Sequence, residues 1–119
     1  MPATKNIRVS IVGSSTFTKL DLIDTAIRQL GPCTVFVAGA KGIKVHVKKI
    51  ANKLGYPVHS HPRRTAIDLS DGVILFMNGT RHLNGTCNYA RCSNKPLIVV
   101  HEQDGGVTFS TENWEWPKS

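Results

Sequence analysis

The sequence lacks the apolar run of roughly 20 residues that a membrane-spanning helix needs. Its opening residues, 1–5, also lack the hydrophobic stretch of a signal peptide. The three cysteines, Cys33, Cys87 and Cys92, are odd in number and show no C-x-x-C spacing, which argues against a disulfide framework. We therefore expect a cytoplasmic protein that does not bind membranes.

Acidic residues are scarce as well. Eight Asp and Glu residues stand against fifteen Lys and Arg residues, so the formal net charge is +7, and the isoelectric point is near 9.7. This excess favours an anionic partner, which is a nucleic acid, an acidic membrane surface or a phosphorylated small molecule. Charge alone does not choose among them. The length of 119 residues fits a single domain, with a core at about 7–101 and a tail at 102–119.

Strand-like and helix-like patterns alternate along the chain. Apolar runs typical of strands occupy 7–12, 34–38, 57–61, 72–77 and 97–101, and the tail has room for one more short strand. Helical spacing occurs at 18–30, at 43–54, briefly at 65–70 and after Gly85. We predict an α/β fold with a single Rossmann-like, doubly wound, mainly parallel five-stranded sheet of order 3-2-1-4-5 and helices on both faces. The connection at 63–71 is short for a parallel crossover.

Three glycine-containing loops follow predicted strands: Gly13-Ser14-Ser15, Gly39-Ala40-Lys41-Gly42 and Asn78-Gly79-Thr80. In such a sheet, ligands bind outside the carboxyl ends of the strands, where the winding direction reverses. Glycine lets backbone N–H groups approach a phosphate, and a helix N-terminus adds partial positive charge. The alternative is that these glycines only make tight turns. Their convergence on one edge favours a binding site.

Three segments together resemble a known family. The stretch 11–18, Ile-Val-Gly-Ser-Ser-Thr-Phe-Thr, is similar to an opening strand followed by G-S-R-x-F, and 37–43 is similar to S-G-G-A-x-G-x. Residues 85–90 and 95–100 resemble a G-T-x-x-x-x-A segment and a following K-P-hydrophobic segment. These patterns are those of the SLOG superfamily, which unites the DNA-processing protein A fold with the Lonely-guy phosphoribohydrolases. The resemblance covers about residues 8–100 and is strongest to the small YspA/YpsA-like members of bacteria and phages.

The resemblance implies a nucleotide-derived ligand in a bacterial or phage-infected cell. It extends the expected ligand-binding set to Gly13, Ser14, Ser15, Gly39, Ala40, Lys41, Lys44, Asn78, Gly79, Thr80, Arg81, Gly85 and Thr86.

The departures from the family concern catalysis and charge. The family's Arg in the first loop is Ser15 here, and the acid after its second loop is Lys44. Where hydrolytic branches carry a Glu after their G-T, this chain offers Asn88 and Tyr89. We therefore expect no catalytic residue and non-catalytic binding of an ADP-ribose-like or cyclic nucleotide signal, by a sensor or a phage-type sequestering protein.

Two other functions stay open. A nucleotide N-glycosidase would need a carboxylate near the ligand, and Glu102 or Asp104, just past the fifth strand, could supply it. A nucleic-acid-binding protein of the DNA-processing branch could use the lysines of the second helix, although no aromatic residues are interleaved with them.

Other ligands and partners have weaker signals. We expect no cofactor and no metal. His59 and His61 share one face of a strand, but the alternation of side chains produces that in any strand. The spacing of His82, Cys87, Cys92 and His101 matches no standard zinc pattern. Trp114 and Trp116 cap the core or sit in a subunit contact. We expect a homo-oligomer.

Overall fold

The computed structural model describes residues 7–14, 17–39, 41–78, 84–103 and 106–112. The strands are β1 (Arg8–Gly13), β2 (Thr34–Gly39), β3 (Val58–Ser60), β4 (Gly72–Asn78), β5 (Leu97–Gln103) and β6 (Gly106–Glu112). The helices are α1 (Leu20–Leu30), α2 (Lys41–Leu54), α3 (Arg63–Leu69) and α4 (Asn84–Cys92). None of these helices combines the length and the apolar character needed to cross a membrane.

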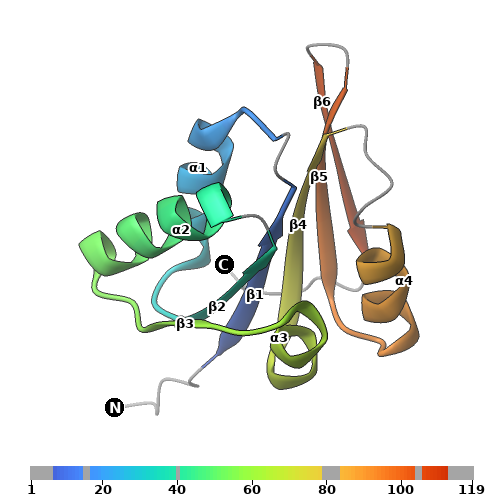
Figure 1. The fold of residues 1–119 in the computed structure, drawn as a ribbon, viewed down its shortest axis with the longest axis horizontal. Helices are drawn as coiled ribbons and strands as arrows, with labels where there is room; N and C mark the ends of the chain where they lie inside the picture. Colours follow the sequence, from blue (N-terminus) through green and yellow to red (C-terminus); the bar gives the residue numbers. More distant parts are fainter. Residues whose placement is uncertain (1–6, 15–16, 40, 79–83, 104–105, 113–119) are drawn as a thin grey trace.

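The strands form one mixed sheet in the order β3-β2-β1-β4-β5-β6 (Figure 1). The first five are mutually parallel and follow the predicted order 3-2-1-4-5. The predicted number of five strands is wrong, because β6 pairs antiparallel with β5 and adds a sixth strand. β6 lies in the tail, where the sequence left room for one more short strand.

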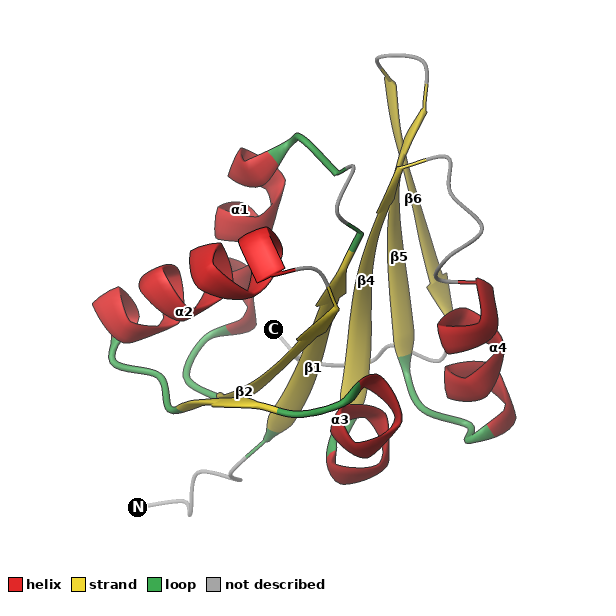
Figure 2. Cartoon of the chain, in the orientation of Figure 1, coloured by secondary structure: helices red, strands yellow, loops and turns green. Residues whose placement is uncertain are grey.

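Helices lie on both faces of the sheet, α1 and α2 on one and α3 and α4 on the other (Figure 2). Each face has its own apolar core. Beneath α1 and α2 the largest wholly buried side chains are Ile11, Ile23, Ile27, Ile74 and Phe76. Beneath α3 and α4 they are Val12, Ile67, Leu75 and Leu97. The alternation of side chains along a strand sends neighbouring residues such as Ile11 and Val12 into opposite cores.

The short crossover from β3 to β4 is possible because β3 itself is short and incomplete. Its last residue, Ser60, pairs with Val37, whereas β2 continues to Gly39. Pro62 then lacks the amide hydrogen that a further ladder bond would require, and α3 begins at the next residue. The edge of the sheet therefore has a step where β3 stops before β2.

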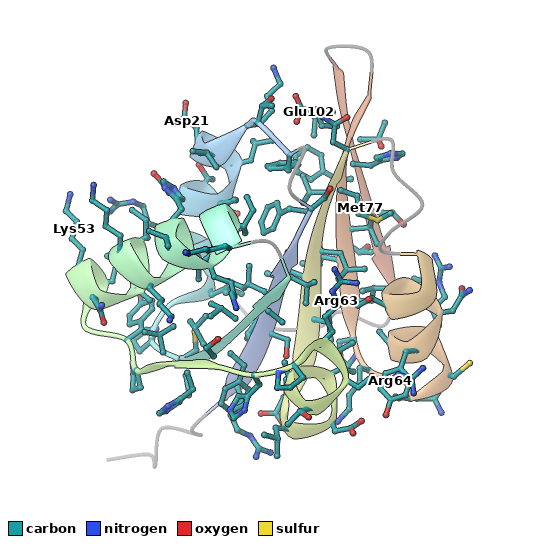
Figure 3. The ribbon with its side chains drawn as sticks, viewed as in Figure 1. Asp21, Lys53, Arg63, Arg64, Met77 and Glu102 are labelled. Carbon is teal, nitrogen blue, oxygen red and sulfur yellow. The ribbon has the colours of Figure 1, made fainter. Side chains whose placement is uncertain are left out.

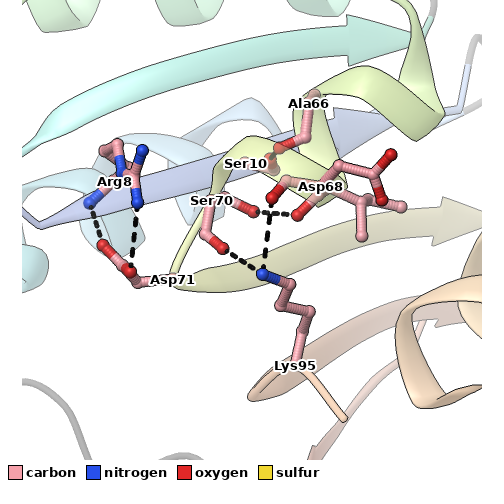
Figure 4. Close-up of polar contacts among 8 residues, drawn as sticks. Arg8, Ser10, Ala66, Asp68, Ser70, Asp71 and Lys95 are labelled. Carbon is pink, nitrogen blue, oxygen red and sulfur yellow. Dashed lines mark hydrogen bonds and ion pairs between the residues drawn. The ribbon is translucent and has the colours of Figure 1, made fainter. Parts of the chain in front are cut away.

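Polar contacts fasten α3 near the amino ends of the strands (Figure 4). The buried hydroxyl of Ser10 on β1 donates to the Ala66 carbonyl at 2.6 Å. After α3, the Asp71 carboxylate accepts from the Arg8 amide at 2.9 Å, and the Lys95 ammonium donates to the Ser70 carbonyl at 2.9 Å. A polar residue inside the apolar strand β1 is explained by this bond, since a buried hydroxyl needs a partner.

Candidate functional site

The carboxyl ends of β1, β2, β4 and β5 meet at one edge of the sheet, as the sequence predicts. Gly13 is the last residue of β1 and lies beside Gly39 of β2 on one side and Phe76 of β4 on the other. The first turn of α2 follows β2 at the same edge. This edge therefore brings the predicted first and second loops together.

Two glycines at this edge are required by packing. A Cβ at position 13 would clash with Ile43 of α2, whose Cγ1 and Cβ atoms would lie 2.7 and 2.8 Å away. Gly39 has a φ of +95°, and a Cβ there would lie 2.6 Å from the Gly13 carbonyl oxygen. The close approach of α2 to β1 and β2 therefore accounts for both glycines without a ligand.

The first loop turns inward after β1. The Ser14 amide donates to the Phe76 carbonyl at 2.9 Å, and the Phe17 amide donates to the Ser14 carbonyl at 3.1 Å. Phe17 is buried and meets the Phe76 ring edge-on, with centroids 5.2 Å apart. The Ser14 amide is therefore engaged within the fold, in contrast to the phosphate-donor role that the sequence suggests for it.

The remaining predicted ligand residues occupy different parts of the edge. Lys41 is exposed at the start of α2, and Asn78 is half-buried at the end of β4. Gly85 and Thr86 lie in the first turn of α4, where Thr86 is buried. Ser15, Ala40, Gly79, Thr80 and Arg81 lie outside the described residues.

A polar hollow of about 420 Å³ lies at the step where β3 ends before β2. We call it the basic hollow, and it is lined by Gly39, Lys44, Ser60, His61, Pro62 and Arg63. Gly39 and Lys44 belong to the predicted site, whereas the other four do not. Sequence reasoning missed these because it placed the ligand between the first and fourth strands. The available signal was the His61-Pro62-Arg63 run directly after the third strand.

Among the described residues that line the basic hollow, three have nitrogen-bearing side chains and none has a carboxylate. Lys44 comes from the first turn of α2, His61 follows β3, and Arg63 begins α3. The Phe36 ring packs edge-on against the His61 ring at a centroid distance of 5.1 Å, so the imidazole is supported from the sheet side. A ligand that fits this lining is an anion.

Glu102, the acid expected to serve a glycosidase, is already engaged at the same edge. It is 7% exposed at the carboxyl end of β5, beside the segment that leads into α1 (Figure 3). One of its carboxylate oxygens accepts from the Thr18 hydroxyl at 2.5 Å, and the other accepts from the Thr18 amide at 2.8 Å. These bonds, with a smaller contribution from Lys19, hold the pKa of the Glu102 carboxyl below its usual range. Asp104 lies outside the described residues.

Other reactive groups give no catalytic arrangement in the described part of the chain. Burial raises the pKa of the Cys33 thiol to about 11, which disfavours the nucleophilic thiolate. No three His, Cys, Asp or Glu side chains among the described residues are grouped as a metal site would require. His59 and His61 have ring centroids 6.5 Å apart. His82 lies outside the described residues.

The chain matches no model of a known protein family and no curated protein.

Replacing Gly39 with Ala should destabilise the fold, by at least about 1–2 kcal/mol, because an L-residue is strained at positive φ and the new Cβ meets the Gly13 carbonyl. Gly42→Ala, in the first turn of α2, is the matched control, since a Cβ at position 42 meets nothing within 4 Å. We expect this control to gain up to about 1 kcal/mol from helix propensity. Urea unfolding measures both, and equal effects of the two substitutions would contradict the packing argument.

Replacing Glu102 with Gln should lower stability at neutral pH, because the amide keeps only one of the two oxygens that accept from Thr18 and carries no charge. A carboxyl whose pKa is lowered by folding stabilises the protein above its ordinary pKa, about 4.3. That stabilisation is lost as the pH falls through the lower folded-state pKa. Urea midpoints of the two proteins should therefore differ at pH 7 and converge toward pH 3. A difference that persists unchanged in acid would show that the charge of Glu102 is not what stabilises the fold.

Proposed function

We propose that this chain binds a phosphate-bearing, nucleotide-derived small molecule in the basic hollow and does not transform it. The observation that carries this proposal is the lining of the hollow, which includes Lys44, His61 and Arg63 and, within the described part of the chain, no carboxylate. Its volume of about 420 Å³ falls in the lower part of the range of small-molecule sites. Arg and Lys side chains are the usual partners of phosphate oxygens, and their charge-assisted hydrogen bonds are strong.

The first turn of α2 supports an anionic ligand independently. A helix N-terminus carries partial positive charge, so acidic residues there are stabilising and basic ones are not. Helix α1 follows this rule with Asp21 in its first turn. Helix α2 has no acid in its first turn and has Lys41 and Lys44 there instead. A bound anion would relieve this unfavourable accumulation of positive charge.

The proposal that the ligand is derived from a nucleotide rests on the resemblance to the SLOG superfamily. For a member of that superfamily, the sheet of this chain would be the family's fold with one added antiparallel strand. We propose an ADP-ribose-like or cyclic nucleotide ligand, held by a sensor or by a protein that sequesters a signal. The phosphate occupies the basic hollow, and the rest of the ligand extends along the sheet edge toward Gly13 and Asn78. Lys44 stands where relatives carry an acid, which suits a more anionic ligand.

Lys44→Gln should weaken binding of phosphate-bearing nucleotides about tenfold, which is about 1.4 kcal/mol and near the low end for a charged hydrogen bond. The same substitution should leave the free protein as stable as the parent, or more stable by up to about 1 kcal/mol, because it removes a cation from a helix N-terminus. The probes are AMP, ADP-ribose and inorganic phosphate, measured by calorimetry at physiological salt. Thermal unfolding without ligand gives the stability.

Lys53→Gln is the matched control, because Lys53 is exposed in the last turn of the same helix, where a cation is favourable. It should bind like the parent and be no more stable. If the Lys44 and Lys53 variants both bind like the parent, the hollow is not the phosphate site.

Tight binding to one nucleic-acid structure at physiological salt would favour the nucleic-acid alternative. Because the chain has a net charge of +7, we expect it to bind nucleic acid only weakly, and only at low salt.

We expect no turnover of nucleoside monophosphates or dinucleotides by the purified protein. A general acid must hold a proton, and the lowered pKa of Glu102 keeps it ionised near neutral pH. Its oxygens are also occupied by Thr18, which leaves them poorly placed to attack a sugar carbon. Chromatography of reaction mixtures for free base and ribose phosphate tests this. Steady release that Glu102→Gln abolishes would establish the glycosidase alternative.

A further inference from the structure

His61 is fixed against β2 at the edge of the basic hollow. Its backbone amide donates to the Val37 carbonyl at 3.1 Å, one residue beyond the end of β3. Its ring packs edge-on against the buried Phe36 ring at a centroid distance of 5.1 Å. Pro62 follows directly, with the restricted φ of its ring. The imidazole therefore lines the hollow from a position that both its backbone and its ring define.

The ionisable groups around His61 are all basic in the described part of the chain. Lys44 of α2 and Arg63 of α3 line the same hollow. The ring centroid of His59 on β3 lies 6.5 Å from that of His61. β2 has no titratable side chain, and none of the described residues that line the hollow is an acid.

The remaining ionisable side chains of α2 and α3 have other neighbours or do not line the hollow. Arg64 lies over the Tyr89 ring, 5.3 Å from its centroid, and Asp68 accepts from the Tyr89 hydroxyl at 2.7 Å. His46 is 2.6 Å from a carboxylate oxygen of Asp24 on α1. The exposed lysines of α2 outside the lining are Lys41, Lys48, Lys49 and Lys53.

The charge of a histidine decides what its ring offers to an anion. A neutral imidazole has one N–H donor and one acceptor nitrogen, whereas the protonated ring donates from both nitrogens. Histidine is the side chain whose charge ordinarily changes between about pH 5 and 8. Without an anion nearby, Lys44 and Arg63 oppose a positive charge on His61, and an anion bound among the three favours it.

We propose that His61 binds the anion in its protonated form, so that ligand binding takes up a proton and strengthens as the pH falls. This inference rests on the proposed function, because it needs an anionic ligand in the basic hollow. Binding and protonation are linked: if the anion favours the protonated ring, a lower pH must favour the anion. Lysine and arginine are ordinarily charged throughout this range, so His61 is the lining residue that supplies the pH dependence.

The probes are ADP-ribose and inorganic sulfate, whose charges do not change between about pH 6 and 8, so a change in affinity originates in the protein. Calorimetry at constant ionic strength measures both. The parent should bind about fivefold more tightly at pH 6 than at pH 8, because a charge-assisted hydrogen bond is roughly twice as strong as a neutral one. At pH 7, the heat of binding should vary with the ionisation heat of the buffer, which reports proton uptake.

His61→Gln should remove both the pH dependence and the proton uptake, because its amide can donate a hydrogen bond but cannot gain a charge. His59→Gln is the matched control. His59 also neighbours the Phe36 ring, with centroids 6.0 Å apart, but it does not line the hollow. This variant should keep the pH dependence and the proton uptake of the parent. Thermal unfolding verifies that both variants are folded.

The outcomes separate this inference from the proposed function. Equal binding by the parent at pH 6 and pH 8, with Lys44→Gln still weakening it, would overturn the role of His61 and leave the phosphate site in place. A pH dependence that His61→Gln retains would assign it to another group and overturn the inference as well. Sulfate binding with the expected pattern but no binding of ADP-ribose would support His61 and contradict the nucleotide-derived ligand. If neither probe binds at either pH, the proposed function and this inference both fail.

Discussion

The packing of Ile43 against Gly13 is the contact on which the carboxyl edge of the sheet depends. Any side chain at position 13 would collide with Ile43 and lift the first turn of α2 away from β1. With α2 in this position, Gly39 must pass the Gly13 carbonyl at a φ of +95°, which only glycine tolerates easily. The start of α2 is thereby fixed over the ends of β1 and β2. Lys44 stands beside the step at β3 as a consequence.

Much of the fold could be predicted from the sequence because apolar residues are spaced differently in its strands and in its helices. β1, β2 and β4 are buried on both faces, so they read as continuous apolar runs between helices. β6 was less predictable, since most of its side chains are exposed and little apolar pattern distinguishes it from a loop. The chain turns back after β5, and β6 becomes a strand by pairing antiparallel with β5. The local sequence of β6 gives little sign of this pairing.

The candidate site could be predicted only in outline. The glycine-rich loops indicated the carboxyl edge of the sheet as the candidate site, but the sequence does not tell whether a missing Cβ makes room for a ligand or for a helix. At Gly13 and Gly39 the neighbours are Ile43 and backbone, which no local pattern reveals. The position of the basic hollow depends on β3 ending at Ser60 opposite Val37, a matter of register between distant strands. Glu102 likewise accepts a hydrogen bond from Thr18, which is 84 residues away in the chain.

The distribution of charge links the scarcity of acids to the site. The described carboxylates are mostly engaged away from the hollow: Asp24 with His46, Asp68 with Tyr89, Asp71 with Arg8, Glu112 with Arg91 and Glu102 with Thr18. These pairs fasten α1 to α2, α3 to α4, β1 to the start of β4, and α4 to β6. Lys44 and Arg63 line a hollow that has no carboxylate among its described lining residues. This chain with few acids thus uses most of the described ones to join its elements, and none of these carboxylates is among the described residues that line the hollow.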